Sequence, residues 1–223
     1  MKIEKLNFDT GTHESVLTDR KLLLGCLEQP FVYIRIPRTG STSISKMLRG
    51  DKLAWPHFYA SLARDLMGKE AYDSRLTFAS VRNPWDRMIS WFLFYSNDYR
   101  ADPDQAEIYK KLGFKGWIMN ECPHSHTSPH HFAHWPKDPI SQLNWIIDDQ
   151  GEIIVDHIVR LESLYQDFEE IRDKLGLPRI VLPRLNTSSK REHQDYRKYY
   201  DWESKEKVRE MYGDDIRYFN YQF

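Results

Sequence analysis

One stretch decides the fold of this chain: Phe31-Val-Tyr-Ile-Arg-Ile-Pro-Arg-Thr-Gly-Ser-Thr-Ser43, followed by Ile44-Ser-Lys-Met-Leu48. A run of β-forming residues meets a proline, and a short loop with one glycine and several hydroxyls then leads into an amphipathic segment. This order predicts a strand, an anion-binding loop and the N-terminus of a helix. Backbone N–H groups and the positive end of a helix converge on such a loop, so the sequence predicts a phosphorylated or sulfated ligand.

The side chains of this loop favour the same kind of ligand. Arg38 carries a full positive charge on a planar fork that can bind an anion through two hydrogen bonds. Thr39, Ser41, Thr42 and Ser43 add hydroxyl donors beside it.

The composition limits the class of protein. The chain has 223 residues, of which 40% are hydrophobic and 14% aromatic, which is enough for a real core. Its formal net charge of −1 argues against general binding of nucleic acid or of a membrane surface, since both need a basic excess. Cys26 and Cys122 are far apart, which argues against a disulfide framework or a Cys-rich zinc site.

We expect a single domain over residues 1–223, with residues 1–28 as a weakly defined lead-in. The first nine residues lack an apolar signal region, and no segment approaches the ~18 consecutive apolar residues of a membrane span. We therefore expect a cytoplasmic protein with no membrane segment. The sequence carries no signature of an oligomeric state.

Apolar runs at residues 31–36, 76–81 and 153–159 predict strands that are buried on both faces. Helical patterns lie between and after them. Strands that alternate with helices predict an α/β, P-loop-like three-layer fold, in which helices flank a central parallel sheet.

The helices carry recognisable start signals. Asn83 is a suitable N-cap for a helix that begins at Pro84, and residues 163–166 read as a capping box that opens another helix. A further helix is predicted over residues 201–212, and residues 98–140 are expected to hold a short helix and a long loop.

A second motif, Val81-Arg-Asn-Pro-Trp-Asp-Arg-Met-Ile-Ser90, follows the second predicted strand. Arg82 lies at the carboxyl end of that strand, where open α/β sheets bind ligands, and Ser90 lies two turns into the following helix. An arginine and a hydroxyl placed in this way can hold one phosphate together. The alternative is an ion pair between Arg82 and Asp86, with Ser90 acting only as a small packing residue.

These two motifs resemble the two nucleotide-binding motifs of sulfotransferases, and more narrowly those of the carbohydrate (Golgi-type, heparan/chondroitin/dermatan) branch. The resemblance extends from about residue 30 to residue 223. Three later phrases resemble phrases of that branch in the same order: Leu161-Glu-Ser-Leu164, Leu185-Asn-Thr-Ser-Ser189 and Tyr212-Gly-Asp-Asp-Ile-Arg-Tyr-Phe219.

The resemblance implies transfer of a sulfuryl group from 3′-phosphoadenosine 5′-phosphosulfate (PAPS) to a small-molecule or oligosaccharide acceptor, without a metal. The residues implied to wrap the 5′-phosphosulfate are Arg38, Thr39, Gly40, Ser41, Thr42 and Ser43. Arg82 and Ser90 are implied to hold the 3′-phosphate, and Ser188, Ser189 and Lys190 to close over the nucleotide.

The chain departs from the family pattern at Arg38, where the first loop of the family usually has lysine. Arginine can stabilise charge on the bridging oxygen of the leaving phosphate, but it cannot give up a proton. An enzyme with Arg38 must therefore do without a proton from this position or obtain one elsewhere.

His57, in Trp55-Pro-His-Phe-Tyr59, is the candidate general base. Histidine suits removal of a proton from an acceptor hydroxyl near neutral pH. In the heparan 2-O-type branch a catalytic histidine occupies a similar place, before the second motif. The alternative is a hydrogen-bonded structural histidine.

Two other polar tracts carry less information. The histidines between 124 and 134 have a spacing that matches no common zinc site, so we expect no metal there. The run Lys190-Arg-Glu-His-Gln-Asp195 is mixed in sign, and apart from Lys190 it reads as a solvated face.

Two alternative functions remain open from sequence. A P-loop-type nucleotide kinase shares the order of strand, loop and helix, but its loop requires Gly-Lys-Ser/Thr, which this loop lacks. A non-catalytic relative that binds nucleotide or sugar is the second alternative, and the arginine at position 38 is the feature that favours it.

Overall fold

The computed structural model of the chain describes residues 25–49, 56–97, 103–120, 141–177 and 191–223. The chain divides into two compact units, one made of residues 1–81 and 142–185 and the other of residues 82–141 and 186–223. The boundary between Val81 and Arg82 separates a strand of the first unit from a helix of the second. Within the described ranges, no helix has the length and apolar character needed to cross a membrane.

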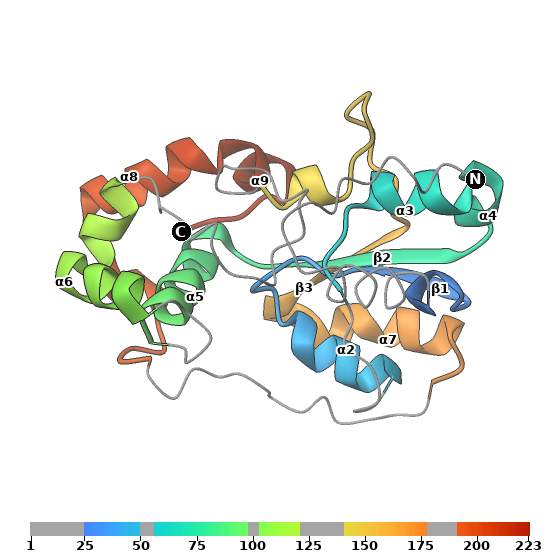
Figure 1. Ribbon diagram of the computed structural model, residues 1–223, viewed down its shortest axis with the longest axis horizontal. Helices are drawn as coiled ribbons and strands as arrows, with labels where there is room; N and C mark the ends of the chain where they lie inside the picture. Colours follow the sequence, from blue (N-terminus) through green and yellow to red (C-terminus); the bar gives the residue numbers. More distant parts are fainter. Residues whose placement is uncertain (1–24, 50–55, 98–102, 121–140, 178–190) are drawn as a thin grey trace. The chain divides into compact units, whose positions relative to one another are not determined.

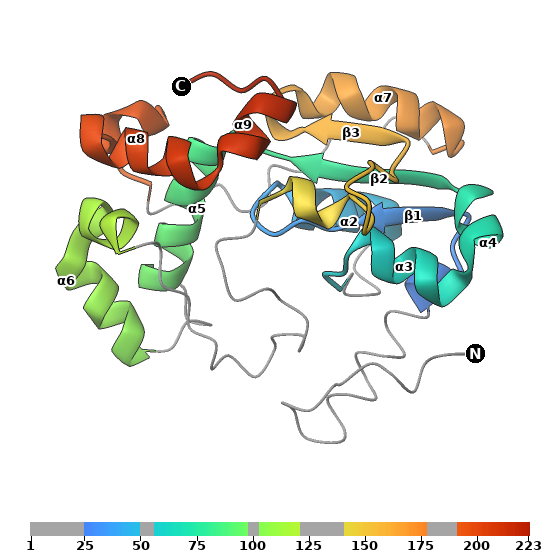
Figure 2. The same ribbon diagram turned by 90° about the horizontal axis from the view of Figure 1, so that it is seen from above.

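A parallel sheet forms the centre of the first unit. Its strands, in spatial order, are β1 (Phe31–Ile34), β2 (Leu76–Val81) and β3 (His157–Arg160). Figure 2 shows this order from above. All side chains of β1 are buried, and so are those of β2 after Leu76, which explains why both strands read as continuous apolar runs. The predicted α/β fold with a central parallel sheet is confirmed.

Two strands are shorter than predicted. β1 ends at Ile34 because the N–H of Ile36 folds back to donate to the Ile34 carbonyl at 3.1 Å. β3 begins only at His157, because Ile153 forms an antiparallel bridge with Ile147 instead of joining the sheet.

Helices cover both faces of this sheet, as Figure 1 shows. One face carries α2 (Ser41–Arg49) and α7 (Leu164–Lys174), and the other carries α3 (Ala60–Met67) and α4 (Lys69–Asp73). The buried residues of α7 are Leu164, Phe168 and Ile171, which form the apolar stripe expected of an amphipathic helix.

The capping box predicted for residues 163–166 is not present. Ser163 precedes α7 but makes no side-chain bond to the backbone of the helix. Its hydroxyl donates instead to Asp167 Oδ2 at 2.9 Å, and the same oxygen accepts the N–H of Arg160 at 2.8 Å. The 3₁₀ turn η4 (Leu161–Ser163) brings these groups together, so a carboxylate one position further along binds the end of β3.

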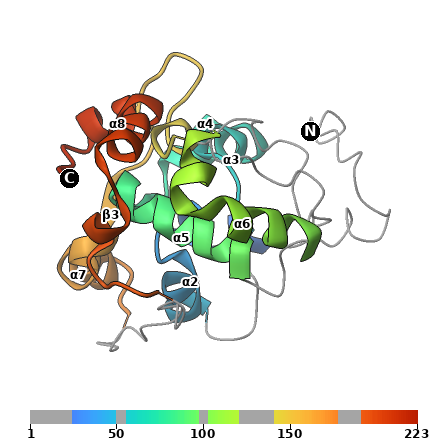
Figure 3. The ribbon, with the colours of Figure 1, turned by 90° about the vertical axis from the view of Figure 1, so that its left-hand side faces the viewer.

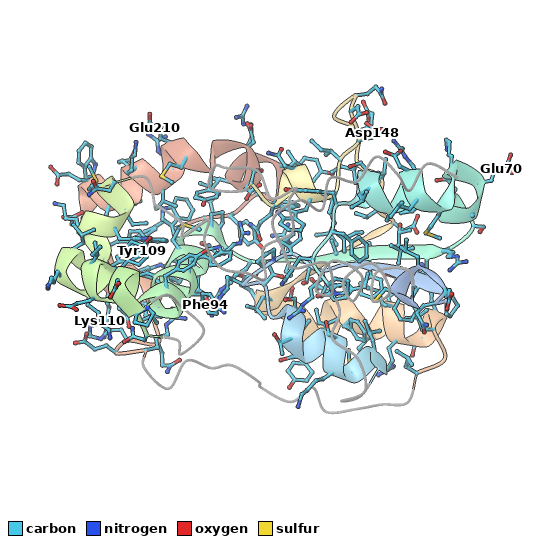
Figure 4. All side chains as sticks on the ribbon, viewed as in Figure 1. Glu70, Phe94, Tyr109, Lys110, Asp148 and Glu210 are labelled. Atoms are coloured by element: carbon cyan, nitrogen blue, oxygen red, sulfur yellow. The ribbon has the colours of Figure 1, made fainter. Side chains whose placement is uncertain are left out.

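One carboxylate holds the loop between η3 (Leu143–Trp145) and β3. Asp148, labelled in Figure 4, accepts the N–H groups of Gln150 and Glu152 at 3.0 Å each. Its other oxygen accepts the Arg64 guanidinium from α3 at 3.2 Å. The loop is therefore fastened both to itself and to a neighbouring helix.

The second unit is helical within the described residues. Its elements are α5 (Pro84–Asn97), α6 (Pro103–Met119), η5 (Tyr196–Tyr199), α8 (Trp202–Met211) and α9 (Gly213–Tyr218). Figure 3 shows α5 and α6 side by side. Aromatic rings of the two helices contact one another. Tyr95 on α5 contacts Tyr109 and Trp117 on α6, with ring centroids 6.2 and 6.5 Å apart.

In this unit, the starts of two helices match the predictions, and a third helical region differs from its prediction. Asn83 Oδ1 accepts the N–H of Trp85 at 3.0 Å, which confirms the predicted N-cap. α8 confirms the helix predicted over 201–212, and its N-cap Asp201 forms a capping box with Ser204. α6 is interrupted at Gly113, whose backbone is not helical, so two short helical segments lie where one short helix was predicted before residue 140.

The core of the second unit contains a buried arginine and a buried aspartate. Arg87 is 1% exposed and Asp215 is completely buried. Burial lowers the pKa of the Arg87 guanidinium, while Tyr212 and Asp215 oppose that shift. Ser141 donates a hydrogen bond to Asp215, which keeps the carboxylate satisfied in the interior.

We expect Asp215→Asn to lower the free energy of unfolding by about 3 kcal/mol or more, because it removes negative charge beside a buried guanidinium. Urea denaturation measures this loss. The adjacent Asp214→Asn is the matched control, because Asp214 is 74% exposed in its ion pair with Arg217. Equal effects of the two substitutions would contradict the role given to Asp215.

Candidate functional site

The loop between β1 and α2 has the backbone expected of an anion-binding turn. Arg38 and Gly40 both adopt left-handed backbone, with φ angles of 66° and 77°. The Gly40 carbonyl accepts the N–H groups of Ser43 and Ile44 at 3.0 and 3.4 Å and so begins α2. The φ angle of Gly40 favours glycine, and a Cβ at this position would lie 2.5 Å from Leu161 Cδ1, so a larger residue would also require the Leu161 side chain to move. The predicted order of strand, loop and helix is present.

Arg38 is the strained residue of the loop. A left-handed φ costs a residue with a side chain about 1 kcal/mol or more, and such strain persists only where neighbours fix the backbone. The surroundings of the loop supply that constraint.

Three buried hydroxyls tie the loop to the sheet. Thr39 Oγ1 donates to the Ile36 carbonyl at 2.8 Å and lies 2.7 Å from Ser80 Oγ, which in turn lies 2.8 Å from Tyr33 Oη. Each hydroxyl has one proton, so donation runs from Tyr33 to Ser80, then to Thr39, and then to Ile36. Burial raises the pKa of the Tyr33 hydroxyl, which keeps the first donor protonated.

The position of Thr39 changes what it can offer to a ligand. The sequence predicts it as an anion ligand, but its side chain is fully buried and its hydroxyl belongs to the chain to Ser80. The Thr39 side chain therefore fixes the loop.

Arg35 is a candidate that the sequence analysis did not identify. Its Nε lies 3.4 Å from Ser41 Oγ and its Nη2 lies 3.3 Å from Thr42 Oγ1, so its guanidinium reaches the first turn of α2. The sequence signal that could have identified Arg35 is its position, directly after a buried strand and before the loop that leads into α2. Arg35 brings a second positive charge, besides that of Arg38, to this part of the chain.

His57 is oriented by the same residue. Its Nδ1 lies 2.6 Å from the Arg35 carbonyl oxygen, which can only accept a hydrogen bond. Nδ1 therefore carries the proton, and in the neutral ring Nε2 is the basic nitrogen. The Trp145 ring meets the imidazole edge-on, with centroids 6.2 Å apart, and Trp145 is itself fully buried. The imidazole is thus held in one tautomer and against a rigid neighbour.

The second motif forms a separate cluster in the second unit. Arg82 Nε and Nη2 lie 2.8 and 2.7 Å from Asp86 Oδ2, which is the ion pair that the sequence left open as an alternative. Arg191 Nη2 lies 2.5 Å from the other oxygen of Asp86. The prediction of a solvated face is wrong for Arg191, whose side chain is only 13% exposed and ion-paired.

Hydrogen bonds to the C-terminal part of the chain hold the start of α5 in place. Asn83 Nδ2 donates to the Gln222 carbonyl at 2.8 Å and to Tyr196 Oη at 3.1 Å. Trp85 Nε1 donates to the Lys205 carbonyl at 3.0 Å. The first turn of α5 is therefore fixed on several sides.

One further predicted site residue is described, and the others lie outside the described residues. Ser90 lies on α5 with a half-buried side chain. Ser188, Ser189 and Lys190 lie outside the described residues, as do the histidines between 124 and 134. Among the described residues, no group of three or more His, Cys, Asp or Glu side chains is arranged to hold a metal ion.

Comparison with known proteins gives two matches. A family model described as "Sulfotransferase family" matches residues 26–222. An uncharacterized protein of Archaeoglobus fulgidus is 27% identical over 139 residues, which cover 62% of this chain and 97% of that protein. No solved structure matches the chain.

Ser80→Ala should lower the free energy of unfolding by about 1–3 kcal/mol, because it leaves the buried Tyr33 hydroxyl without its acceptor. Tyr33→Phe should cost less, because Ser80 then keeps the bond that it donates to Thr39. Urea denaturation of both variants gives the comparison. A larger loss for Tyr33→Phe would contradict donation from Tyr33 to Ser80.

Proposed function

The chain belongs to the sulfotransferase family, and we propose that it transfers a sulfuryl group from PAPS to a hydroxyl group of a carbohydrate acceptor. Sulfuryl transfer follows from the family. PAPS as donor and a carbohydrate as acceptor rest on the motifs and on the branch that they resemble.

The orientation of His57 is the observation that carries this proposal. A base for sulfuryl transfer must present a basic nitrogen to the acceptor hydroxyl, and the Arg35 carbonyl fixes the tautomer in which Nε2 is that nitrogen. Because Arg35 lies between β1 and the anion loop, one short segment serves both the base and the donor site.

Each phosphate of the donor is assigned to one motif. We assign the 5′-phosphosulfate to the loop of Arg38, Gly40 and the first turn of α2, where backbone N–H groups and hydroxyls meet. We assign the 3′-phosphate to Arg82 and Ser90, with the bidentate geometry that arginine favours. Ser188, Ser189 and Lys190 remain predicted contributors.

The proposed reaction is a single in-line transfer. His57 Nε2 takes the proton of the acceptor hydroxyl, and the acceptor oxygen attacks sulfur as the bond from sulfur to the 5′-phosphate oxygen breaks. The products are a sulfate ester and adenosine 3′,5′-bisphosphate. Arg38 and the N–H groups of the loop stabilise the charge that develops on the leaving oxygen.

Arginine at position 38 sets one requirement on this mechanism. A guanidinium stays protonated throughout, so Arg38 acts through charge and hydrogen bonds alone. The leaving oxygen must therefore depart as a phosphate anion that positive charge stabilises. The second guanidinium, that of Arg35, adds to that charge at the same end of α2.

We expect adenosine 3′,5′-bisphosphate to bind the purified protein with micromolar or tighter affinity, and Arg82→Ala to weaken that binding at least tenfold, which is about 1.4 kcal/mol. Isothermal titration calorimetry measures both affinities. Arg209→Ala is the matched control, since Arg209 also pairs with a carboxylate in the second unit but is 65% exposed.

The same titration tests the alternative functions. Binding of ATP with magnesium in preference to the bisphosphate would favour a nucleotide kinase, and binding of neither nucleotide would overturn the donor assignment. Tight bisphosphate binding without transfer to any acceptor in a broad screen would favour a non-catalytic relative.

We expect His57→Ala to reduce transfer by about 10²–10⁴-fold while the bisphosphate affinity stays unchanged, because the base acts on the acceptor and not on the donor. Transfer of radiolabelled sulfate from PAPS to a panel of unsulfated oligosaccharides and small alcohols measures the rate. His157→Gln is the control, because His157 is a half-buried histidine of the same unit that contacts Lys174. Near-normal turnover of His57→Ala would exclude His57 as the base.

A further inference from the structure

Asp86 holds two arginines that come from distant parts of the sequence. Arg82 uses two nitrogens on Asp86 Oδ2, at 2.8 and 2.7 Å, and Arg191 uses one nitrogen on Oδ1, at 2.5 Å. The three side chains are 11%, 18% and 13% exposed in the order Arg82, Asp86, Arg191. Each guanidinium therefore has its own carboxylate oxygen in a largely buried setting, where such pairs are strong.

The carboxylate also makes the arrangement electrostatically possible. Two guanidiniums close together at the positive end of α5 repel one another and the helix dipole, and Asp86, in the first turn of that helix, offsets both effects. Arg191 is fixed further by its Nε, which donates to the His193 carbonyl at 2.8 Å. The three charges sum to +1, to which the helix N-terminus adds a partial positive charge.

We propose that Asp86 is a positioning residue that holds Arg82 and Arg191 as a pair, and that this pair makes the site selective for nucleotides that carry a 3′-phosphate. This inference rests on the proposed function, which assigns the 3′-phosphate to Arg82. It adds a residue that acts through the arginines, and it gives the largely buried Arg191 a role in recognition.

The sign of the effect of removing Asp86 distinguishes positioning from simple proximity. A carboxylate that is only near the site repels a bound phosphate, so its removal tightens binding. If the carboxylate positions the arginines, its removal weakens phosphate binding, because both guanidiniums lose their orientation. In the second case, the affinity for a ligand without the 3′-phosphate does not change.

The test is calorimetric titration of wild-type protein, Asp86→Asn and Asp86→Glu with adenosine 3′,5′-bisphosphate and with adenosine 5′-phosphate. We expect Asp86→Asn to weaken bisphosphate binding about tenfold while the affinity for the monophosphate stays unchanged. Asp86→Glu, which keeps the charge, should recover part of the loss. Asp214→Asn, an exposed carboxylate paired with Arg217, should leave both affinities as in wild type.

Arg191→Ala is a second, independent test, which is needed if Asp86→Asn folds poorly. In this variant the ion pair between Asp86 and Arg82 remains. We expect it to weaken bisphosphate binding and to spare the monophosphate, and the double variant with Asp86→Asn should be less affected than the product of the two single effects predicts. Thermal melting of each variant separates lost affinity from lost folding.

The outcomes separate this inference from the function on which it rests. Wild-type protein that binds the bisphosphate no more tightly than the monophosphate would overturn the assignment of the 3′-phosphate. A wild-type preference that persists or increases in Asp86→Asn would overturn the role of Asp86 alone.

Discussion

Hydrogen bonding from Tyr33 through Ser80 to Thr39 joins two parallel strands to the loop at the carboxyl end of the sheet. All three hydroxyls are buried, so each must be satisfied within the protein. The loop contains left-handed backbone at Arg38 and Gly40, which is unfavourable for the arginine unless the surroundings fix it. The hydroxyl chain supplies that constraint. The shape of the loop between β1 and α2 is therefore set by the interior of the first unit.

In both units, aspartate side chains also join neighbouring segments of the chain. Asp156 binds the N–H and the hydroxyl of Thr77 just before β3 begins, and Asp167 binds the end of the same strand. Asp148 joins its own loop to α3, and Asp86 joins two arginines. A carboxylate offers several acceptor positions on a short side chain, so one residue can satisfy donors from two segments and fix their separation.

Much of the fold could be predicted because its signals are local. Continuous apolar runs indicated the buried strands β1 and β2, and Asn83 before Pro84 indicated the start of α5. The errors occurred where an alternative contact between residues close in the sequence changed a boundary. Ile153 pairs with Ile147 and so delays β3, and Asp167 takes the partners that a capping box at Ser163 would have used. The sequence allowed both the predicted and the observed partners, and the packing around each segment decided between them.

The candidate site divides in the same way. The sequence by itself indicated the order of strand, loop and helix, the glycine of the loop and the motif that follows β2, because turn chemistry and charge are properties of neighbouring residues. His57 stands as a candidate base because histidine suits the chemistry and because of the family resemblance. Only the tertiary structure decided that Thr39 faces inward to Ser80, that Arg35 fixes the tautomer of His57, and that Arg191 pairs with Asp86. The physical reason is that each of these depends on the register of parallel strands or the packing of helices. Strand register and helix packing both bring together groups that are far apart in the chain. The residues next to each group in the sequence give no signal of these contacts.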